Sequence, residues 1–173
     1  MEFTDVLALR CSVRAYTEEA VSAEEMAAVL DAAQRAPVGH HQYAGYRLTV
    51  IQNQDVLSCM RKTFSEVSGR ADDPSYGAPV FIIVSVTPEA SEVVRKYDCA
   101  CIIENMHLAA TNLGLGSCYI HGMIRTIREE KAWQEAAGIA KEDVPMCGLI
   151  LGHAKMAARK RPARENMEVH FCK

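Results

Sequence analysis

The stretch from Thr87 to Gly114 constrains the fold of this chain more than any other. Thr87 can cap a helix and Pro88 suits its first position, and neither Pro nor Gly follows until Gly114, where a left-handed stop is expected. The sequence therefore predicts one helix of about 27 residues, roughly 40 Å long at 1.5 Å per residue. Such a helix is well above the usual three or four turns.

The second half of this predicted helix, Cys99 to Leu113, is apolar on nearly every side. Its apolar residues are Cys99, Ala100, Cys101, Ile102, Ile103, Met106, Leu108, Ala109, Ala110 and Leu113. A helix that is apolar most of the way round is buried on most sides. In a chain of 173 residues, we expect this helix to run through the middle of the fold or to be covered by a second copy of the chain.

The other periodic segments predict one layer of strands flanked by helices, in an α/β or α+β arrangement. We expect helices over residues 3–9, 22–36, 56–64 and 124–137, the second opened by a capping box of Ser22 and Glu25. We expect strands near residues 47–51, 80–86, 117–120, 146–151 and 167–171. Neither an internal repeat nor a linker divides the chain, so residues 1–173 are expected to form a single domain.

Composition and charge exclude several classes of protein. The 49% hydrophobic and 24% charged residues are ordinary for a soluble globular domain. A net charge of -3 argues against nucleic acid as the main partner. The acidic start lacks the apolar region of a signal peptide, and apolar runs are too short to span a membrane. The seven cysteines, an odd number, indicate reduced thiols in a cytoplasmic protein.

The segment Arg10 to Tyr16 is the first candidate for a binding site. If it is extended, Arg10, Ser12 and Arg14 share one side, because side chains alternate along a strand. Two guanidinium groups flanking a hydroxyl suit a phosphate. Taken by itself, this heptapeptide fits a solvated strand end better. A second basic stretch follows residue 153 and could converge with the first on one anion; it contains Lys155, Arg159, Lys160, Arg161 and Arg164.

Three other motifs give weaker signals. The adjacent residues His40 and His41 lack Cys, Asp or Glu at ligand spacing, so we expect no metal site there. The glycines after the long helix follow a helix instead of a strand and lack the third glycine of a dinucleotide fingerprint. Cys99 and Cys101 point about 200° apart on a helix and cannot share one ligand, which favours buried structural cysteines over a thiol or metal centre.

In their order and spacing, the motifs along nearly the whole chain together resemble the FMN-dependent nitroreductase family in its short, single-domain form. The residues that carry the resemblance are Arg10 to Tyr16, Ala36-Pro37-Val38-Gly39, Tyr76-Gly77-Ala78-Pro79, Asp98-Cys99-Ala100, Glu104 to Ala110, Gly114 to Ile120 and Leu151-Gly152-His153. The resemblance implies an α+β nitroreductase-like fold with a central mixed sheet flanked by helices. It also implies an intertwined homodimer, with the long helix at the interface and the C-terminal strand extending to the partner.

The resemblance further implies two FMN sites at the dimer interface. Arg10, Ser12 and Arg14, with Cys11 between them, would hold the flavin phosphate and ribityl chain, and Arg159 and Arg161 would approach the same phosphate. Pro37, Val38 and Gly39 would line one face of the ring from the partner subunit. Backbone groups of Ile120, His121 and Gly122 would face the ring near N5.

The function implied is an NAD(P)H-dependent FMN oxidoreductase. Hydride from NADH or NADPH would pass through flavin N5 to a small-molecule acceptor, nitroaromatic, quinone or related, by a ping-pong mechanism. The cofactor carries the chemistry, so no side chain is expected to be a catalytic acid or base. The alternative is a protein that stores, delivers or senses FMN without significant turnover, since the same phosphate site serves both functions.

The chain departs from the family pattern at two places. Val38 to Tyr43 stands where many members carry a Ser-rich stretch with an Asn and then Gln-Pro-Trp, so His40, His41 and Tyr43 are candidates for a different pocket rim. Asp72 or Asp73 stands where an Asn often contacts the flavin. A carboxylate near the pyrimidine edge would lower the flavin potential.

Overall fold

Four strands form the centre of the computed structural model, which describes residues 1–163 and 167–172. They are β1 (Tyr46–Ile51), β2 (Val80–Val86), β3 (Gly116–Ile120) and β4 (Val144–Gly152), in the order β1-β2-β4-β3. All three pairings between these strands are antiparallel. One isolated parallel bridge joins Ser12 to Ser117 at the edge of β3. The expected mixed sheet is therefore antiparallel among the described strands, apart from that bridge.

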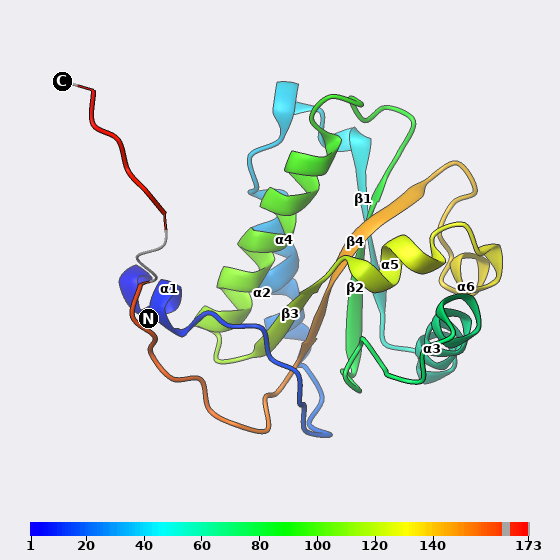
Figure 1. Ribbon diagram of the computed structural model, residues 1–173, viewed down its shortest axis with the longest axis horizontal. Coiled ribbons are helices and arrows are strands. Elements are labelled where there is room, and N and C mark those ends of the chain that lie inside the picture. The colour runs from blue at the N-terminus through cyan, green and yellow to red at the C-terminus, as the bar shows by residue number, and fades with distance from the viewer. Residues whose placement is uncertain (164–166, 173) are drawn as a thin grey trace.

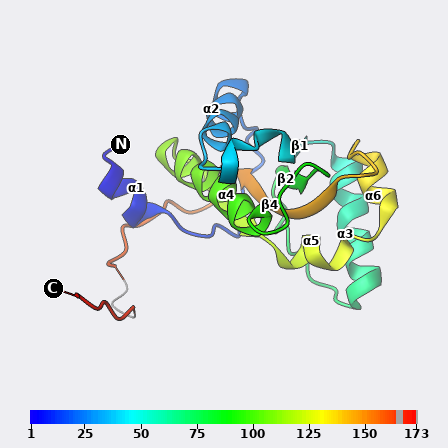
Figure 2. The same cartoon turned by 90° about the horizontal axis from the view of Figure 1, so that it is seen from above.

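Helices cover both faces of the sheet (Figures 1 and 2). One face carries α2 (Ala23–Gln34) and α4 (Arg95–Asn112), and the other carries α3 (Gln54–Ser68), α5 (Gly122–Ile127) and α6 (Lys131–Ala136). Each face has its own hydrophobic core: the first core lies under α2 and α4, and the second under α3, α5 and α6. Ile82 and Val84 of β2 pack in the first core and Phe81 and Ile83 in the second, because successive side chains of a strand point to opposite faces. The expected strand buried on both faces is confirmed.

Three short helices complete the fold. They are α1 (Phe3–Leu9) and the 3-10 turns η1 (Gly39–His41) and η2 (Tyr43–Gly45). Both α1 and α2 form where the sequence predicts them, and the Ser22 and Glu25 capping box opens α2. Asn53 caps α3 and Gly69 ends it in the left-handed conformation, so α3 is longer than the predicted 56–64.

The long helix starts later than predicted: α4 has 18 residues and begins at Arg95. The Thr87 amide donates to the Gly45 carbonyl at 3.0 Å, and its hydroxyl donates to the Ala44 carbonyl at 2.9 Å. These bonds hold the start of the segment in a turn against the end of η2, so Thr87 caps no helix. Of the ten apolar residues from Cys99 to Leu113, five are buried between the sheet, α1 and α2: Cys99, Ile102, Ile103, Met106 and Ala110.

The predicted helix over residues 124–137 is two helices, α5 and α6. The Trp133 indole donates to the Ile127 carbonyl at 2.7 Å, and the Gln134 amide donates to the Arg128 carbonyl at 2.7 Å. These side chains satisfy carbonyl groups that a continuous helix would bond along its own backbone. The chain therefore turns between the two helices and packs the Trp133 ring fully into the second core.

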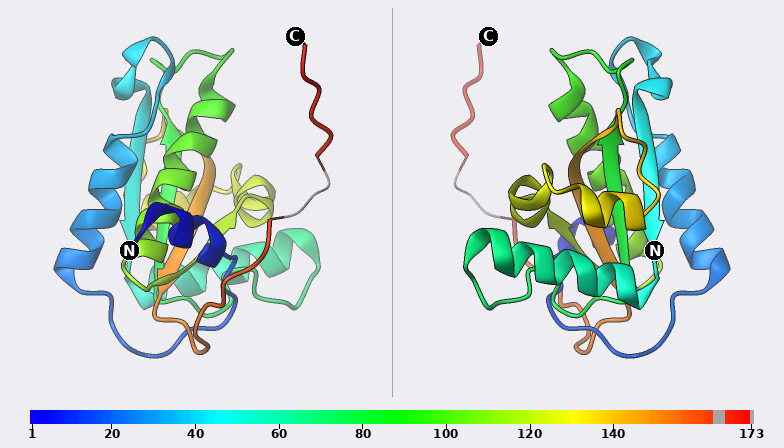
Figure 3. Two further views of the ribbon diagram at one scale, coloured as in Figure 1. Left: turned by 90° about the vertical axis from the view of Figure 1, so that its left-hand side faces the viewer. Right: turned by 90° about the vertical axis from the view of Figure 1, so that its right-hand side faces the viewer.

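Residues 167–172 lie away from the rest of the chain, with exposed side chains (Figures 1 and 3). Within the described chain these residues form no strand and take no part in the sheet. A strand over 167–171 would need a second copy of the chain and stays a prediction, and Arg164 lies outside the described residues. Of the helices in residues 1–163 and 167–172, none is both long and apolar enough to cross a membrane.

Candidate functional site: an arginine-rich cavity beside the edge strand

The segment that follows α1 lies along the free edge of β3. The Val13 amide donates to the Ser117 carbonyl at 2.9 Å, next to the bridge between Ser12 and Ser117. This close approach requires a glycine at position 116, since a Cβ there would lie 2.9 Å from a methyl carbon of Val13. Edge pairing thus makes residues 10–16 extended, as the alternation of the sequence predicts.

The chain that leaves β4 returns along this segment. The Lys155 amide donates to the Ala15 carbonyl at 3.0 Å, and the Arg161 amide donates to the Ala8 carbonyl at 2.9 Å. These backbone hydrogen bonds place the segment that contains Arg159 and Arg161 alongside the segment of Arg10 to Arg14. The two basic stretches therefore lie side by side, and their convergence on one anion stays a prediction.

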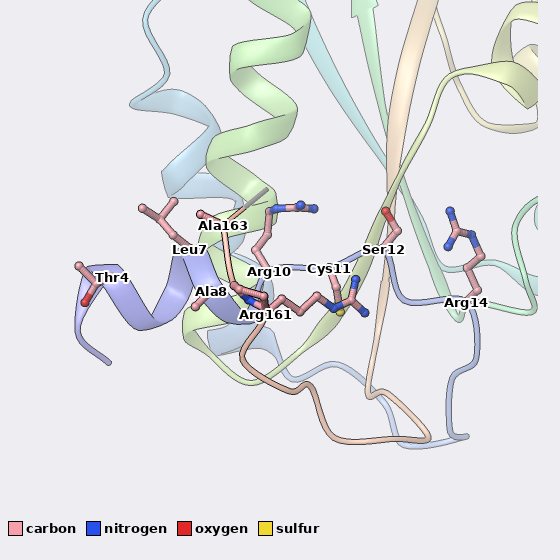
Figure 4. Close-up of a pocket in the computed structure, with 10 residues that line it drawn as sticks. Thr4, Leu7, Ala8, Arg10, Cys11, Ser12, Arg14, Arg161 and Ala163 are labelled. Carbon is pink, nitrogen blue, oxygen red and sulfur yellow. The ribbon is translucent and has the colours of Figure 1, made fainter. Parts of the chain in front are cut away.

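A cavity of about 660 Å³ opens between α1, the edge segment and the returning chain (Figure 4). Arg10, Ser12 and Arg14 point to one side of the segment, and Cys11 points to the other, beside Arg161. A neighbouring cavity of about 630 Å³ also contains Arg159. The lining of the first cavity comprises Thr4, Leu7, Ala8, Arg10, Cys11, Ser12, Arg14, Arg161, Pro162 and Ala163.

The cavity carries a strong positive charge. Arg10 lies 3.8 Å from Glu104, whereas Arg14, Arg159 and Arg161 form no ion pair within residues 1–163 and 167–172. Guanidinium groups without an ion-pair partner suit an anion with several acceptor oxygens. Backbone hydrogen bonds hold the segments that bear these groups close to each other. The structure thus favours an anion site over a merely solvated strand end.

Arg14 connects this cavity to a second pocket. Its guanidinium lies 5.7 Å from the centre of the Tyr76 ring, and the proximity of Tyr76 raises the pKa of Arg14. A pocket of about 300 Å³ begins there and is lined by Ile120, His121 and Gly122, where β3 ends and α5 begins. The two groups of predicted residues therefore lie along one continuous surface.

Pro37, Val38 and Gly39 do not join this surface within one chain. The Gly39 amide donates to Asp98 at 3.1 Å in the first turns of α4, and none of the three residues lines the arginine-rich cavity or the pocket at Ile120 to Gly122 (Figure 1). The expectation that these residues line a flavin from the partner subunit stays a prediction. His40, His41 and Tyr43 follow them in η1 and η2 and line neither pocket.

The two candidate aspartates have different roles. Asp73 accepts from the Ser75 amide at 2.8 Å and from the Gly77 amide at 2.9 Å, so it stabilises the turn that carries Tyr76. Asp72 lines the second pocket and pairs with Arg70 at 2.6 Å. The carboxylate nearest the pocket is therefore neutralised by a neighbouring arginine, which the sequence did not predict.

The sequence reasoning also missed two residues that shape the site. Tyr76 has a positive φ of 52°, and its ring faces Arg14 from the turn before β2. His107 lies in the buried face of α4 and contacts the Cys11 carbonyl. A single histidine among apolar helix positions was the available signal.

Within the described ranges, groups of three or more His, Cys, Asp or Glu placed to hold a metal ion are absent.

The sheet, the two helical layers and the basic edge site together define a protein of the nitroreductase class. The nitroreductase family profile matches residues 7–153, and the chain belongs to this family. A nitroreductase with bound FMN from Bacteroides fragilis is 26% identical, with a TM-score of 0.86 and 99% of each chain covered. A second FMN-bound nitroreductase, from Desulfitobacterium hafniense, is 23% identical with a TM-score of 0.84 over 99% of each chain.

A curated relative extends the comparison. The FMN reductase [NAD(P)H] of Bacillus subtilis is 28% identical over 171 residues, which cover 87% of this chain and 65% of the relative. The expected fold, α+β with a central sheet between helices, is confirmed by these similarities.

Proposed function

We propose that this protein is an NAD(P)H-dependent FMN oxidoreductase that reduces a small-molecule acceptor. The observation that carries the proposal is the arginine-rich cavity at the edge of β3, continuous through Arg14 with the pocket at Ile120 to Gly122. The FMN-bound nitroreductase from Bacteroides fragilis and the FMN reductase from Bacillus subtilis support the same function.

The residues present fit the phosphate end of FMN. Arg10, Arg14 and Arg161 supply guanidinium donors, and Ser12 supplies a hydroxyl between them. The Ser117 hydroxyl is buried at the same edge without a hydrogen-bond partner among the described residues. A phosphate with several acceptor oxygens satisfies such a donor set, and its charge offsets the repulsion among the guanidinium groups.

The pocket at Ile120 to Gly122 fits the ring end of FMN. When bound, FMN supplies the redox chemistry, taking hydride from NADH or NADPH and passing it to an oxidised acceptor. The chain's own part at this end is to bind and orient the cofactor through backbone groups of Ile120 to Gly122. Backbone donors at that position would stabilise negative charge on the reduced ring. One open face shared by donor and acceptor predicts ping-pong kinetics with nitroaromatic, quinone or related acceptors.

We also propose a homodimer as the functional unit. In the single chain the pocket at Ile120 to Gly122 is open on one side, and Pro37 to Gly39 do not line it. A second chain packed on α4 would bring those residues to the open side. The extended residues 167–172, with Val169 and Phe171 exposed, would then pair with the partner.

The test is an absorbance spectrum of the purified protein, followed by anaerobic addition of NADH and then NADPH. We expect flavin bands that bleach rapidly with at least one nucleotide and recover when a nitroaromatic or quinone is added. A protein that cannot be loaded with FMN would overturn the proposal. Flavin bands that ignore both nucleotides would instead support the alternative, an FMN carrier or sensor.

A further inference from the structure

A further cavity, of about 310 Å³, lies beside the ends of β3 and β4, between the start of α4 and the end of α5. Three cationic side chains, Lys96, Arg125 and Arg128, line it together with His121 and Tyr119. The remaining lining residues are Cys99, Met146 and Cys147, so it contains no carboxylate. The cavity is thus a positively charged recess with an apolar and thiol floor.

The cations of this recess lack partners in the part of the chain that the structure describes. None of Lys96, Arg125 and Arg128 forms an ion pair there, although the neighbouring Arg95 pairs with Glu92 at 3.6 Å. The Nε atom of Arg128 is also buried without a hydrogen-bond acceptor. A buried donor without an acceptor is destabilising, so an acceptor oxygen supplied by a ligand is favoured.

The electrostatics of the neighbouring groups agree with this concentration of charge. Burial lowers the pKa of His121, and the nearby Arg125 and Arg128 lower it further. The pKa of the Cys147 thiol is also lowered, chiefly by its neighbours Cys99 and Tyr119 and also by Arg128. Cationic groups that depress their neighbours' pKa values in this way stabilise an anion bound among them.

The recess adjoins the pocket where the reaction is proposed to occur. Tyr119, His121 and Arg125 line both cavities. A molecule that stacks beside Ile120 to Gly122 can therefore extend past His121 and place a substituent against Arg128 and Lys96. Its volume of about 310 Å³ lies at the lower end of the roughly 300–1,000 Å³ of ligand sites, so it suits a small substituent or a single ring.

We propose that Lys96, Arg125 and Arg128 form an anion subsite that selects a reactant bearing a carboxylate or phosphate group. This inference rests on the proposed function, because it concerns the molecules that react beside Ile120 to Gly122. Two sources can supply the anion: an acidic substituent on the acceptor, or a phosphate of the nucleotide donor. Ping-pong kinetics separate them, because each reactant has its own kcat/KM.

The kinetic test uses Lys96→Gln and Arg128→Gln, with Arg61→Gln as the control that removes a charge on α3 away from both cavities. The acceptors are 4-nitrobenzoate and 4-nitrobenzamide, which share a ring and a nitro group but differ in charge. We expect the ratio of their kcat/KM values to fall by about tenfold in the Arg128 variant, because a charge-assisted hydrogen bond is lost. The FMN dissociation constant should stay unchanged.

Each kinetic outcome decides the proposal. A loss confined to 4-nitrobenzoate assigns the subsite to the acceptor, and a loss confined to NADH or NADPH assigns it to the donor phosphate. Equal effects on all reactants, or none, would overturn the subsite. Circular dichroism and thermal unfolding establish that each variant is folded before its kinetics are interpreted.

A binding measurement separates failure of the subsite from failure of the proposed function. Calorimetric titration with benzoate and with benzamide, on the protein with and without FMN, requires no turnover. We expect benzoate to bind the unmodified protein more tightly than benzamide, and this preference to disappear in Arg128→Gln. If the protein neither binds FMN nor turns over, the proposed function fails while the titration still decides the subsite.

Discussion

The His107 Nε2 atom lies 3.3 Å from the carbonyl oxygen of Cys11, which joins the buried face of α4 to the arginine-rich edge segment. The His107 side chain is 3% exposed, and burial lowers its pKa. Nearby Arg10 lowers the pKa further, while the Cys11 carbonyl and Glu104 oppose the shift. The neutral imidazole therefore donates to Cys11 and fixes the backbone between Arg10 and Ser12.

This arrangement predicts that stability falls with acid. Because the pKa of His107 is lower in the folded protein, the unfolded chain binds more protons below the ordinary histidine value of about 6.5. The contribution is fully present above that pH and is lost as pH falls. Urea unfolding at about pH 7.5 and about pH 5.5 should show a shallower pH dependence in His107→Gln than in the unmodified protein. Identical pH dependence in both proteins would contradict this role.

Removing either of two arginines should weaken FMN binding. Arg14→Ala and Arg161→Ala should each cost about 1.5–3 kcal/mol of binding free energy, because each loses a charge-assisted hydrogen bond to phosphate. Lys62→Ala is the matched control, since Lys62 is exposed on α3 and pairs with Glu66. Fluorescence titration with FMN measures the change, and unchanged affinity in both arginine variants would refute the phosphate assignment.

Asp98 should be important for stability. Its Oδ2 atom accepts from the Tyr46 hydroxyl at 2.5 Å and from the Gly39 amide at 3.1 Å, and the residue is buried. Asp98→Ala leaves both donors without an acceptor, so the free energy of unfolding should fall by about 2–3 kcal/mol. Tyr46→Phe removes one of the two bonds and should cost about 1 kcal/mol. Urea unfolding compares them, and equal losses would argue against a shared carboxylate.

Gly148 should tolerate no side chain. A Cβ at this position in β4 would lie 2.5 Å from the Phe81 ring and 2.7 Å from the Ile82 carbonyl oxygen. Gly148→Ala should therefore destabilise the protein by about 1–3 kcal/mol, because the strands must move apart.

The control for Gly148→Ala is Gly122→Ala, at the first residue of α5, where nothing lies within 4 Å of the added Cβ. Thermal unfolding should show a lower midpoint for Gly148→Ala and an equal or slightly higher one for Gly122→Ala. Equal midpoints for the two variants would contradict the crowding at Gly148.

Local patterns in the sequence predicted most of the elements. The capping box at Ser22, the apolar run of β2 and the alternation of residues 10–16 each depend on neighbouring residues, and all three appear in the structure. The start of α4 and the break between α5 and α6 depend on long-range or side-chain hydrogen bonds. Thr87 bonds to Ala44 and Trp133 bonds to Ile127, and neither contact is visible in a periodic pattern.

The site was predictable where basic residues cluster along the chain, and unpredictable where the fold alone brings residues together. Arg10, Arg14 and Arg161 stand out by charge in a chain of net charge -3. Tyr76 beside Arg14 and Arg128 beside Lys96 come from separate elements that only the folded chain unites. The family resemblance alone predicted that Ile120 to Gly122 face the flavin ring, because composition does not indicate such a role.

The return of the chain from β4 to α1 has a consequence for the order of events in biosynthesis. Arg159 and Arg161 leave the ribosome after every strand of the sheet, at a synthesis rate of about 5–20 residues per second. The backbone bond from Arg161 to Ala8 can form only then. The arginine-rich cavity therefore cannot be complete until this last segment has emerged, after all four described strands.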